Sequence, residues 1–367
     1  MMKVLFITNI PAPYRIDFYN ELGKSVDLTV IFEAKSAEGI RFNWNINEIK
    51  NFKAIFLSEG NINEKKVDWK ILKYIKKNEY DHIVATSYSY FTEMIALIFM
   101  KIKKIPYYLE TDGGLVREEN KIKRLYKRFL ISGAKGYFSP SKASDEYLIF
   151  YGANKSRIYR YPFTSLKEKD ILSKKLNLKD KKYIKEQLGI KEEKMVLSVG
   201  QFIHRKGYDI LLNSIEGLDD NIGVYIVGGT PTTEYLKLKK DLDLKNVYFK
   251  EFMTTEEISL YFKAADIFVL PTREDIWGLV INEAMAHGLP VITTDKCIAG
   301  LELVDEVNGS IVSINNKYEL RKEIDKILSN EEIIECMGKE SLRKIKKYTI
   351  ENMSKKHISC FNNILNK

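Results

Sequence analysis

At 367 residues the chain is too long for one ordinary hydrophobic core, so two domains are expected. Its content of 45% hydrophobic and 12% aromatic residues excludes a disordered protein. The net charge of +9 lies entirely in residues 1–165, which carry 27 Lys and Arg against 18 Asp and Glu.

That charge excess has two readings. It is either a solvated lysine-rich surface or the mark of an anionic partner, such as a membrane surface or a lipid phosphate. KIKRLYKRFLI (121–131) interleaves basic and apolar residues at helical spacing, which fits a basic helix lying on a membrane and also an ordinary packed helix. We expect no nucleic-acid partner.

The sequence offers no segment that would cross a membrane. The N-terminal apolar run is short, is ended by Pro11 and Pro13 and has no cleavage site typical of a signal peptide. The longest apolar run, MIALIFM (94–100), is far below the roughly 20 residues that a bilayer requires. The cysteines show no ligand spacing and indicate reduced thiols, at positions Cys297, Cys336 and Cys360. We therefore expect a cytoplasmic protein, with peripheral contact to the inner face of the cell membrane as the open alternative.

In chain order, short apolar runs alternate with helical patterns in both halves. The first half predicts buried strands at 3–8, 27–33, 81–86, 105–110 and 136–140. Helical patterns lie between them, for example at 65–77 and 142–152. The second half repeats the rhythm, with strands at 194–200, 223–229, 246–251, 266–271 and 290–295. This alternation predicts an α/β protein with two doubly wound parallel sheets.

A charged segment without strands separates the two halves. We place an N-terminal domain at 1–165, a linker at 166–192 with one helix near 178–188, and a C-terminal domain at 193–349. The last segment, 350–367, reads as an amphipathic helix with no following strand. Because ligands bind at the carboxyl ends of strands in open α/β sheets, we expect a cleft where the two sheets face each other.

The stretch REDIWGLVINEAMAHGLPVITTD (273–295) places two acids around a helix start. We expect the helix to begin near Gly278, so that the first N–H groups, from Trp277 to Val280, lack intrahelical partners and favour an anion or hydroxyl oxygens. Asp275 precedes the helix and Glu283 lies within it, so each could accept hydrogen bonds from a different part of a ligand. The alternative is that Asp275 is only a helix cap and Glu283 is a paired acid on the surface.

The same stretch resembles the signature of the retaining nucleotide-sugar glycosyltransferases of family four, whose GT-B fold has two Rossmann-like domains facing a cleft. In that family the first acid is usually Glu, where Asp275 stands here. The matching positions are Trp277, Gly278, Leu279, Glu283, Ala284, Gly288, Pro290 and Val291. The resemblance implies that the signature residues bind the donor sugar nucleotide. It also implies that the C-terminal helix, 350–367, packs back on the N-terminal domain.

The loop VLSVGQFIHRKGYDILLNSI (196–215) is similar to the family's first donor-domain loop. The resemblance implies that Lys206 contacts the donor diphosphate. Gln201 stands where the family usually has Arg, and Arg205 could replace the missing cation. Fixed positive charge is needed because a departing diphosphate gathers negative charge. An exposed loop pair is the plainer reading of Arg205 and Lys206.

Further donor and acceptor residues follow from the resemblance. Phe252 and Met253 occupy the segment that holds the nucleobase, although either could be core. In the N-terminal half, Tyr14 and Arg15 lie in the position of the first acceptor-side loop. Gly113 and Gly114 would let the backbone approach a ligand closely. Many members place a His beside the donor sugar here; this sequence offers Glu110 and Asp112 instead, and these acids could also merely shape the turn.

The resemblance thus implies a hexosyltransferase that uses a UDP- or GDP-linked sugar as co-substrate, needs no cofactor or catalytic metal, and retains the anomeric configuration. In a front-face mechanism the departing diphosphate takes the acceptor's proton, so no strong protein base is required. The acceptor would be a glycan or a lipid-linked glycan in cell-surface polysaccharide biosynthesis. Two alternatives stay open: a sugar-nucleotide epimerase of the same fold, and a non-catalytic nucleotide-sugar-binding protein. A dehydrogenase is disfavoured because no Gly-x-Gly-x-x-Gly follows the first strand of either half.

Overall fold

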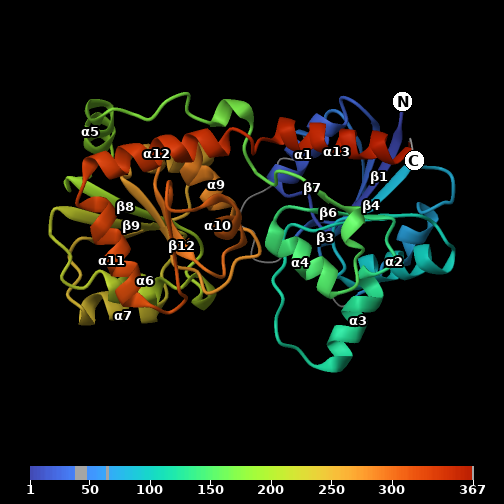
Figure 1. Ribbon diagram of the computed structural model, residues 1–367, viewed down its shortest axis with the longest axis horizontal. Coiled ribbons are helices and arrows are strands. Elements are labelled where there is room, and N and C mark those ends of the chain that lie inside the picture. Colours follow the sequence, from blue (N-terminus) through green and yellow to red (C-terminus); the bar gives the residue numbers. More distant parts are fainter. Residues whose placement is uncertain (38–47, 63–65, 366–367) are drawn as a thin grey trace. The chain divides into compact units, whose positions relative to one another are not determined.

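The computed structural model describes residues 1–37, 48–62 and 66–365, which form two compact units (Figure 1). Unit 1 comprises Met1–Ser165 and Thr349–Lys367, and unit 2 comprises Leu166–Tyr348. Residues 166–192, expected to be a linker, therefore lie within unit 2.

Unit 1 is built on a parallel sheet. Its described residues form seven strands in the order β3-β2-β1-β4-β5-β6-β7, and every neighbouring pair is parallel. The strands are β1 (Lys3–Thr8), β2 (Asp27–Ser36), β3 (Lys53–Asn61), β4 (His82–Ala85), β5 (Tyr108–Glu110), β6 (Gly136–Ser139) and β7 (Ile158–Arg160).

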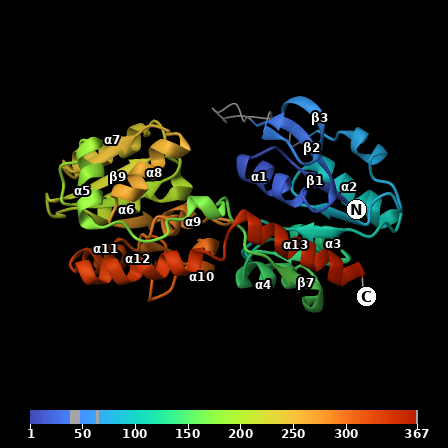
Figure 2. The ribbon, with the colours of Figure 1, turned by 90° about the horizontal axis from the view of Figure 1, so that it is seen from above.

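Helices cover both faces of this sheet (Figure 2). Alternate residues of β1 point to opposite faces: Leu5 and Ile7 pack in a core with α2 and α4, whereas the ring of Phe6 lies 6.0 Å from that of Phe18 on α1. The C-terminal helix α13 packs on α1. The helices of unit 1 are α1 (Pro13–Leu22), η2 (Trp69–Lys73), α2 (Phe91–Ile102), α3 (Lys121–Ile131), α4 (Lys142–Phe150), η3 (Lys155–Arg157) and α13 (Ile350–Leu365).

Unit 2 repeats the plan with a six-stranded parallel sheet in the order β10-β9-β8-β11-β12-β13. The strands are β8 (Lys194–Val199), β9 (Ile222–Val227), β10 (Val247–Lys250), β11 (Ile267–Leu270), β12 (Val291–Thr294) and β13 (Gly309–Val312). One face is covered by α6, α7 and α11, whose apolar residues form a core with those of the strands.

The helices of unit 2 are η4 (Glu168–Asp170), α5 (Leu178–Gln187), η5 (His204–Lys206), α6 (Tyr208–Ser214), α7 (Thr233–Asp241), α8 (Thr255–Ala264), α9 (Leu279–Ala286), α10 (Ile298–Leu303), α11 (Lys317–Leu328) and α12 (Glu331–Ile345). Helix α5 is tied to the sheet by a buried cluster, in which the carboxylate of Asp266 accepts hydrogen bonds from Lys181 and Lys185.

Both sheets have the doubly wound strand order. The chain first adds strands on one side of the first strand of the sheet and then adds the remaining strands on its other side. The reversal lies between β1 and β4 in unit 1 and between β8 and β11 in unit 2. The expectation of two doubly wound parallel sheets is confirmed. In folds of this kind, ligands bind beside the reversal point, at the carboxyl ends of the strands. No helix in the described ranges combines the length and the apolar character needed to span a bilayer.

Candidate active site

The predicted donor residues Lys206 and Asp275 meet at the reversal point of unit 2. Lys206 ends η5, which follows β8, and Asp275 lies in the loop after β11. Because β8 and β11 are neighbouring parallel strands, both loops leave the sheet at the same edge. The Lys206 Nζ donates to Asp275 Oδ2 at 2.6 Å, and Arg205 Nη1 lies 3.5 Å from Asp275 Oδ1. The side chains of Lys206 and Asp275 are only 12% and 13% exposed, so this ion pair is largely shielded from water.

Hydrogen bonds hold the two loops against each other. The Arg273 N–H donates to the Arg205 carbonyl at 2.8 Å, and Arg205 Nη1 donates to the Glu274 carbonyl at 2.8 Å. The Arg273 guanidinium also donates to both carboxylate oxygens of Asp209, at 2.8 and 2.6 Å. Burial raises the pKa of Asp209, but the bonds from Arg273 outweigh burial and hold that pKa below its usual range. The cations beside Asp275 are therefore positioned by the protein itself.

Two glycines allow the loops to approach this closely. Gly207 has φ 69°, and a Cβ there would lie 2.1 Å from the carbonyl oxygen of Pro271. Gly229, after β9, has φ 97°, and a Cβ there would lie 2.4 Å from the ring of Phe252. Phe252, predicted near the nucleobase, thus packs over the turn after β9 and is 39% exposed. The loops after β8, β9 and β10 consequently gather at one edge of the sheet.

The other residues predicted to bind the donor lie nearby along the same loops. Gln201 is exposed in the turn after β8, and Met253 is half-buried after β10. Leu279 and Val280 form the first, half-buried turn of α9.

The start of α9 is fixed by contacts to the segment after β12. The Asp275 N–H donates to the Lys296 carbonyl at 2.9 Å, and the Asp275 carbonyl accepts from the Ile298 N–H at 3.2 Å. Gly278 is the N-cap, as expected, with φ 98°. Burial raises the pKa of the Cys297 thiol to about 12, and the negative charge of Asp275 adds to the rise. The thiol therefore stays neutral beside the site.

Trp277 contributes its side chain to the core. It is 3% exposed, and its Nε1 donates to Asn282 Oδ1 at 2.9 Å. Its carbonyl accepts from the Ala299 N–H at 2.8 Å. A contact between Trp277 and a donor would therefore use its backbone N–H, which is the group that the sequence analysis named. Glu283 lies half-buried on α9, and its carbonyl accepts from His287 Nδ1 at 2.8 Å.

In unit 1 the structure brings together Tyr14, Arg15 and Asp112. Asp112 Oδ2 accepts from Arg15 Nη2 at 2.6 Å and from the Tyr14 hydroxyl at 3.1 Å. Burial raises the pKa of the Asp112 carboxyl, and the charge of Arg15 offsets only part of that rise. Arg15 Nη1 also lies 3.8 Å from Glu110 Oε1. The residues predicted for the acceptor side and the two predicted acids therefore form one network at the carboxyl ends of β1 and β5.

Glu110 has a partner that sequence reasoning missed. Its Oε2 lies 2.9 Å from Nε2 of His357 on α13, and both side chains are fully buried. His357 Nδ1 lies 2.8 Å from the Met353 carbonyl, and its ring stacks on Phe138 with centroids 4.6 Å apart. Since 247 positions separate His357 from Glu110, no local motif could have found this pair.

The local structure explains why glycine stands at the two positions that follow these acids, Gly113 and Gly114. Gly113 has φ 154°, and its N–H donates to Thr111 Oγ1 at 3.2 Å. At Gly114 a Cβ would lie 2.7 Å from the ring of Tyr147. Close approach to a ligand stays a prediction for both.

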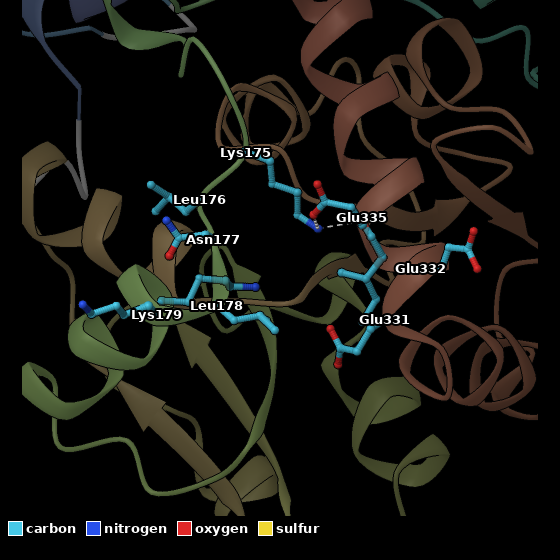
Figure 3. Close-up of a pocket in the computed structure, with 10 residues that line it drawn as sticks. Lys175, Leu176, Asn177, Leu178, Lys179, Glu331, Glu332 and Glu335 are labelled. Carbon is cyan, nitrogen blue, oxygen red and sulfur yellow. Dashed lines mark hydrogen bonds and ion pairs between the residues drawn. The ribbon is translucent and has the colours of Figure 1, made fainter.

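A separate hollow of about 730 Å³ lies in unit 2 between the start of α5 and the start of α12 (Figure 3). In it the Lys175 amine points to Glu335, with Nζ 3.4 Å from Oε2, and donates to the Ile334 carbonyl at 2.7 Å. Burial lowers the pKa of Lys175 to about 8. The lining residues are Lys175, Leu176, Asn177, Leu178, Lys179, Lys181, Glu331, Glu332, Ile334 and Glu335. This hollow contains none of the predicted site residues.

The donor-side geometry can be compared with known proteins. Residues 180–351 match the family model described as "Glycosyl transferases group 1". This part of the chain is therefore similar to group 1 glycosyltransferases. The expected resemblance to GT-B glycosyltransferases is thereby confirmed for the part that holds Lys206, Asp275 and Glu283.

Relatives of known sequence agree with this assignment over part of their length. An uncharacterized glycosyltransferase of Haemophilus influenzae is 33% identical over 167 residues, 44% of this chain and 46% of that protein. The lipopolysaccharide glucosyltransferase WaaG of Escherichia coli is 29% identical over 124 residues, 32% of this chain and 33% of WaaG. The chain thus matches less than half the length of these curated relatives.

Solved structures extend the likeness to the whole chain, at the level of the fold. Alr3699/HepE of Anabaena, crystallised with UDP, superposes with a TM-score of 0.80 over 99% of this chain and 100% of its own, at 17% identity. The GT-B fold of the chain is confirmed by this likeness. Over the described ranges, no three His, Cys, Asp or Glu side chains gather closely enough to hold a metal ion.

Proposed function

We propose that the protein is a retaining hexosyltransferase that moves a sugar from a nucleotide sugar to a glycan or lipid-linked acceptor. The observation that carries this proposal is the meeting of Lys206, Arg205 and Asp275 at the reversal point between β8 and β11, beside the start of α9. Cations and free amides at the carboxyl edge of a doubly wound sheet suit a diphosphate. A carboxylate at the same point suits sugar hydroxyls, because it offers about four acceptor sites.

In the proposed reaction the bond between the anomeric carbon and the diphosphate breaks as the acceptor hydroxyl attacks from the same face. The leaving diphosphate takes the acceptor's proton, so the protein supplies position and positive charge rather than a strong base. Lys206 and Arg205 would stabilise the departing diphosphate, and Asp275 with Glu283 would hold the donor. Two fixed cations would thus stabilise the charge of the leaving diphosphate, which is the task of a divalent metal ion in other transferases.

The donor that we propose is a UDP-linked hexose, with a GDP-linked sugar as the alternative. HepE of Anabaena, whose fold this chain shares, was crystallised with UDP and with UDP-glucose. WaaG, similar to part of this chain, is named a lipopolysaccharide glucosyltransferase. The name of WaaG supports a role in cell-surface polysaccharide assembly, and we propose that this role is carried out at the cytoplasmic face of a membrane. On the acceptor side we propose Tyr14, Arg15, Glu110 and Asp112, because they form one network at the carboxyl ends of β1 and β5.

The proposal is tested by screening nucleotide sugars for thermal stabilisation and then assaying nucleotide release with and without a lipid-linked acceptor. Acceptor-dependent release supports transfer, acceptor-independent sugar conversion indicates an epimerase, and binding without turnover indicates a non-catalytic protein. Lys206→Ala should lower turnover by about a hundredfold, since one charged hydrogen bond to the leaving group is lost. The matched control is Lys245→Ala, because Lys245 is a surface lysine of unit 2 whose side chain is 79% exposed. Equal turnover in the two variants would refute the diphosphate role of Lys206.

A further inference from the structure

Helix α3 of unit 1 displays an apolar stripe that is largely exposed, although Lys101 Nζ lies 4.7 Å from the centre of the Phe129 ring. Ile122 is 83% exposed, Leu125 is 70% exposed and Phe129 is 52% exposed. Their spacing of three and four residues places them on one face of the helix, together with Tyr126, which is 42% exposed. Only Leu130 and Ile131, at the end of the helix, are buried. The sequence alone left open whether this helix packs inside the protein, and the structure answers that its apolar stripe does not.

Basic side chains border the stripe. The helix sequence KIKRLYKRFLI contains five basic residues and no acidic one, and Lys121, Lys123 and Arg128 are exposed. Lys127 is partly engaged, because its Nζ lies 2.9 Å from Glu119 Oε2, and the Arg124 guanidinium lies 4.2 Å from the centre of the Phe150 ring. The exposed face thus combines large apolar side chains with positive charge.

The same character continues onto the end of α2. Lys101 Nζ donates to the carbonyls of Phe129 and Ser132, the latter at 2.6 Å, which joins the end of α2 to that of α3. The next residue, Ile102, is 72% exposed, and Lys103 and Lys104 follow it. Helix α3 stands at one edge of unit 1 in Figure 1. We call Ile102, Lys103, Lys104 and the exposed residues of α3 the α3 surface.

We propose that the α3 surface docks on a bilayer of anionic phospholipid. Apolar side chains of this size can enter the boundary between headgroups and acyl chains, while neighbouring lysines and arginines reach the phosphates. A protein partner would need an apolar groove lined by acids, whereas a bilayer supplies both an apolar layer and a uniform negative surface. The orientation would bring a lipid-linked acceptor to unit 1. The inference rests on the proposed membrane setting for its biological meaning, but not on the identity of the reaction.

The test is sedimentation of the full-length protein with phosphatidylcholine vesicles, pure or containing phosphatidylglycerol, at low and high salt. We expect binding only to the anionic vesicles and weaker binding at high salt. Leu125→Ser combined with Phe129→Ser, and Lys121→Glu combined with Arg128→Glu, should each weaken binding at least about tenfold. The matched control on unit 2 is Leu236→Ser combined with Lys245→Glu, since Leu236 is 49% exposed on α7; it should bind as the unaltered protein does.

Equal binding to neutral vesicles, or unchanged binding by both α3 variants, would overturn the proposal. It would also be overturned if the protein formed dimers that the α3 variants abolish while no vesicle binding is seen, because the surface would then join two copies of the chain. Thermal stabilisation by nucleotide sugars separates this inference from the proposed reaction. Donor binding that persists in variants unable to bind vesicles supports the docking surface, and vesicle binding without any donor response would refute only the reaction.

Discussion

We predict that the free energy of unfolding falls as the pH rises, because unit 1 contains the buried acid pair Glu33 and Glu93. Glu93, in the first turn of α2, is fully buried, and neither of its carboxyl oxygens has hydrogen-bonding geometry to a described group. Its backbone N–H donates to Glu33 Oε1 on β2 at 3.1 Å. Burial raises the pKa of Glu93 to about 8, with the charge of Glu33 adding to it, and burial raises that of Glu33 to about 7. Glu93 is therefore protonated at neutral pH.

The sign and size of the effect follow from linkage. The pKa of Glu93 is higher in the folded protein than its ordinary value of 4.5, so its stabilising contribution is complete below pH 4.5 and is lost as the pH rises through about 8. Between pH 6 and pH 9 this one group should lower the free energy of unfolding by about 2–3 kcal/mol. Glu93→Gln keeps the shape of the side chain and removes the titration. The unaltered protein should therefore lose about 2–3 kcal/mol more than Glu93→Gln over that range.

Urea unfolding, followed by far-ultraviolet circular dichroism from pH 6 to pH 9, measures this difference. Glu118→Gln is the matched control, because Glu118 is an exposed glutamate of the same unit, and its pH profile should parallel that of the unaltered protein. Parallel profiles for Glu93→Gln and the unaltered protein would refute the reasoning. Such a result would mean that water reaches Glu93 or that the carboxyl finds a partner when it ionises.

Three further predictions concern the two sites. Glu283→Ala should weaken nucleotide-sugar binding about tenfold or more, as expected for the loss of a charged hydrogen bond, which calorimetric titration measures directly; unchanged affinity would remove Glu283 from the donor site. His357→Phe should lower the free energy of unfolding by about 3 kcal/mol, because it leaves the buried Glu110 carboxyl without its nearest partner, and His357→Gln should cost less in the same urea experiment. Gly207→Ala should cost about 1–3 kcal/mol and reduce donor binding, because a Cβ there meets a backbone carbonyl oxygen at 2.1 Å; Gly217→Ala, at φ 65° with open space around it, should lose less stability and leave donor binding unchanged.

The meeting of Lys206 and Asp275 was largely predictable, because the two residues lie in short segments that follow adjacent strands. Lys206 and Asp275 stand 69 positions apart, yet each comes directly after a strand whose apolar pattern is clear. Once two doubly wound sheets are expected, the loops after β8 and β11 must lie at the same edge. The helix start at Gly278 was equally readable, since glycine precedes an apolar run of helical spacing.

Other elements could not be predicted from the sequence, because their patterns are weak or depend on contacts with distant parts of the chain. The strand β3 (Lys53–Asn61) is an edge strand whose residues are exposed or half-exposed except for Leu57, so its composition carries little strand signal. The helical pattern at 65–77, whose first residue lies outside the described ranges, yields only the short helix η2 (Trp69–Lys73). Its apolar residues Ile71 and Ile75 are buried in the core with α2, so the periodicity marked burial rather than a long helix.

The ion pair between Lys206 and Asp275 affects how the result of a substitution at either residue should be interpreted. Lys206 has a counterion in Asp275, 2.6 Å away, and the second carboxylate oxygen of Asp275 lies 3.5 Å from Arg205. A diphosphate that engages these cations must share them with Asp275 or displace it, and a carboxylate released from Lys206 can accept sugar hydroxyls instead. Under the proposed function, the Asp275 carboxylate would therefore both position the two cations and accept hydrogen bonds from the donor. Changes at Lys206 and Asp275 should consequently be far from additive, because each residue is the main partner of the other.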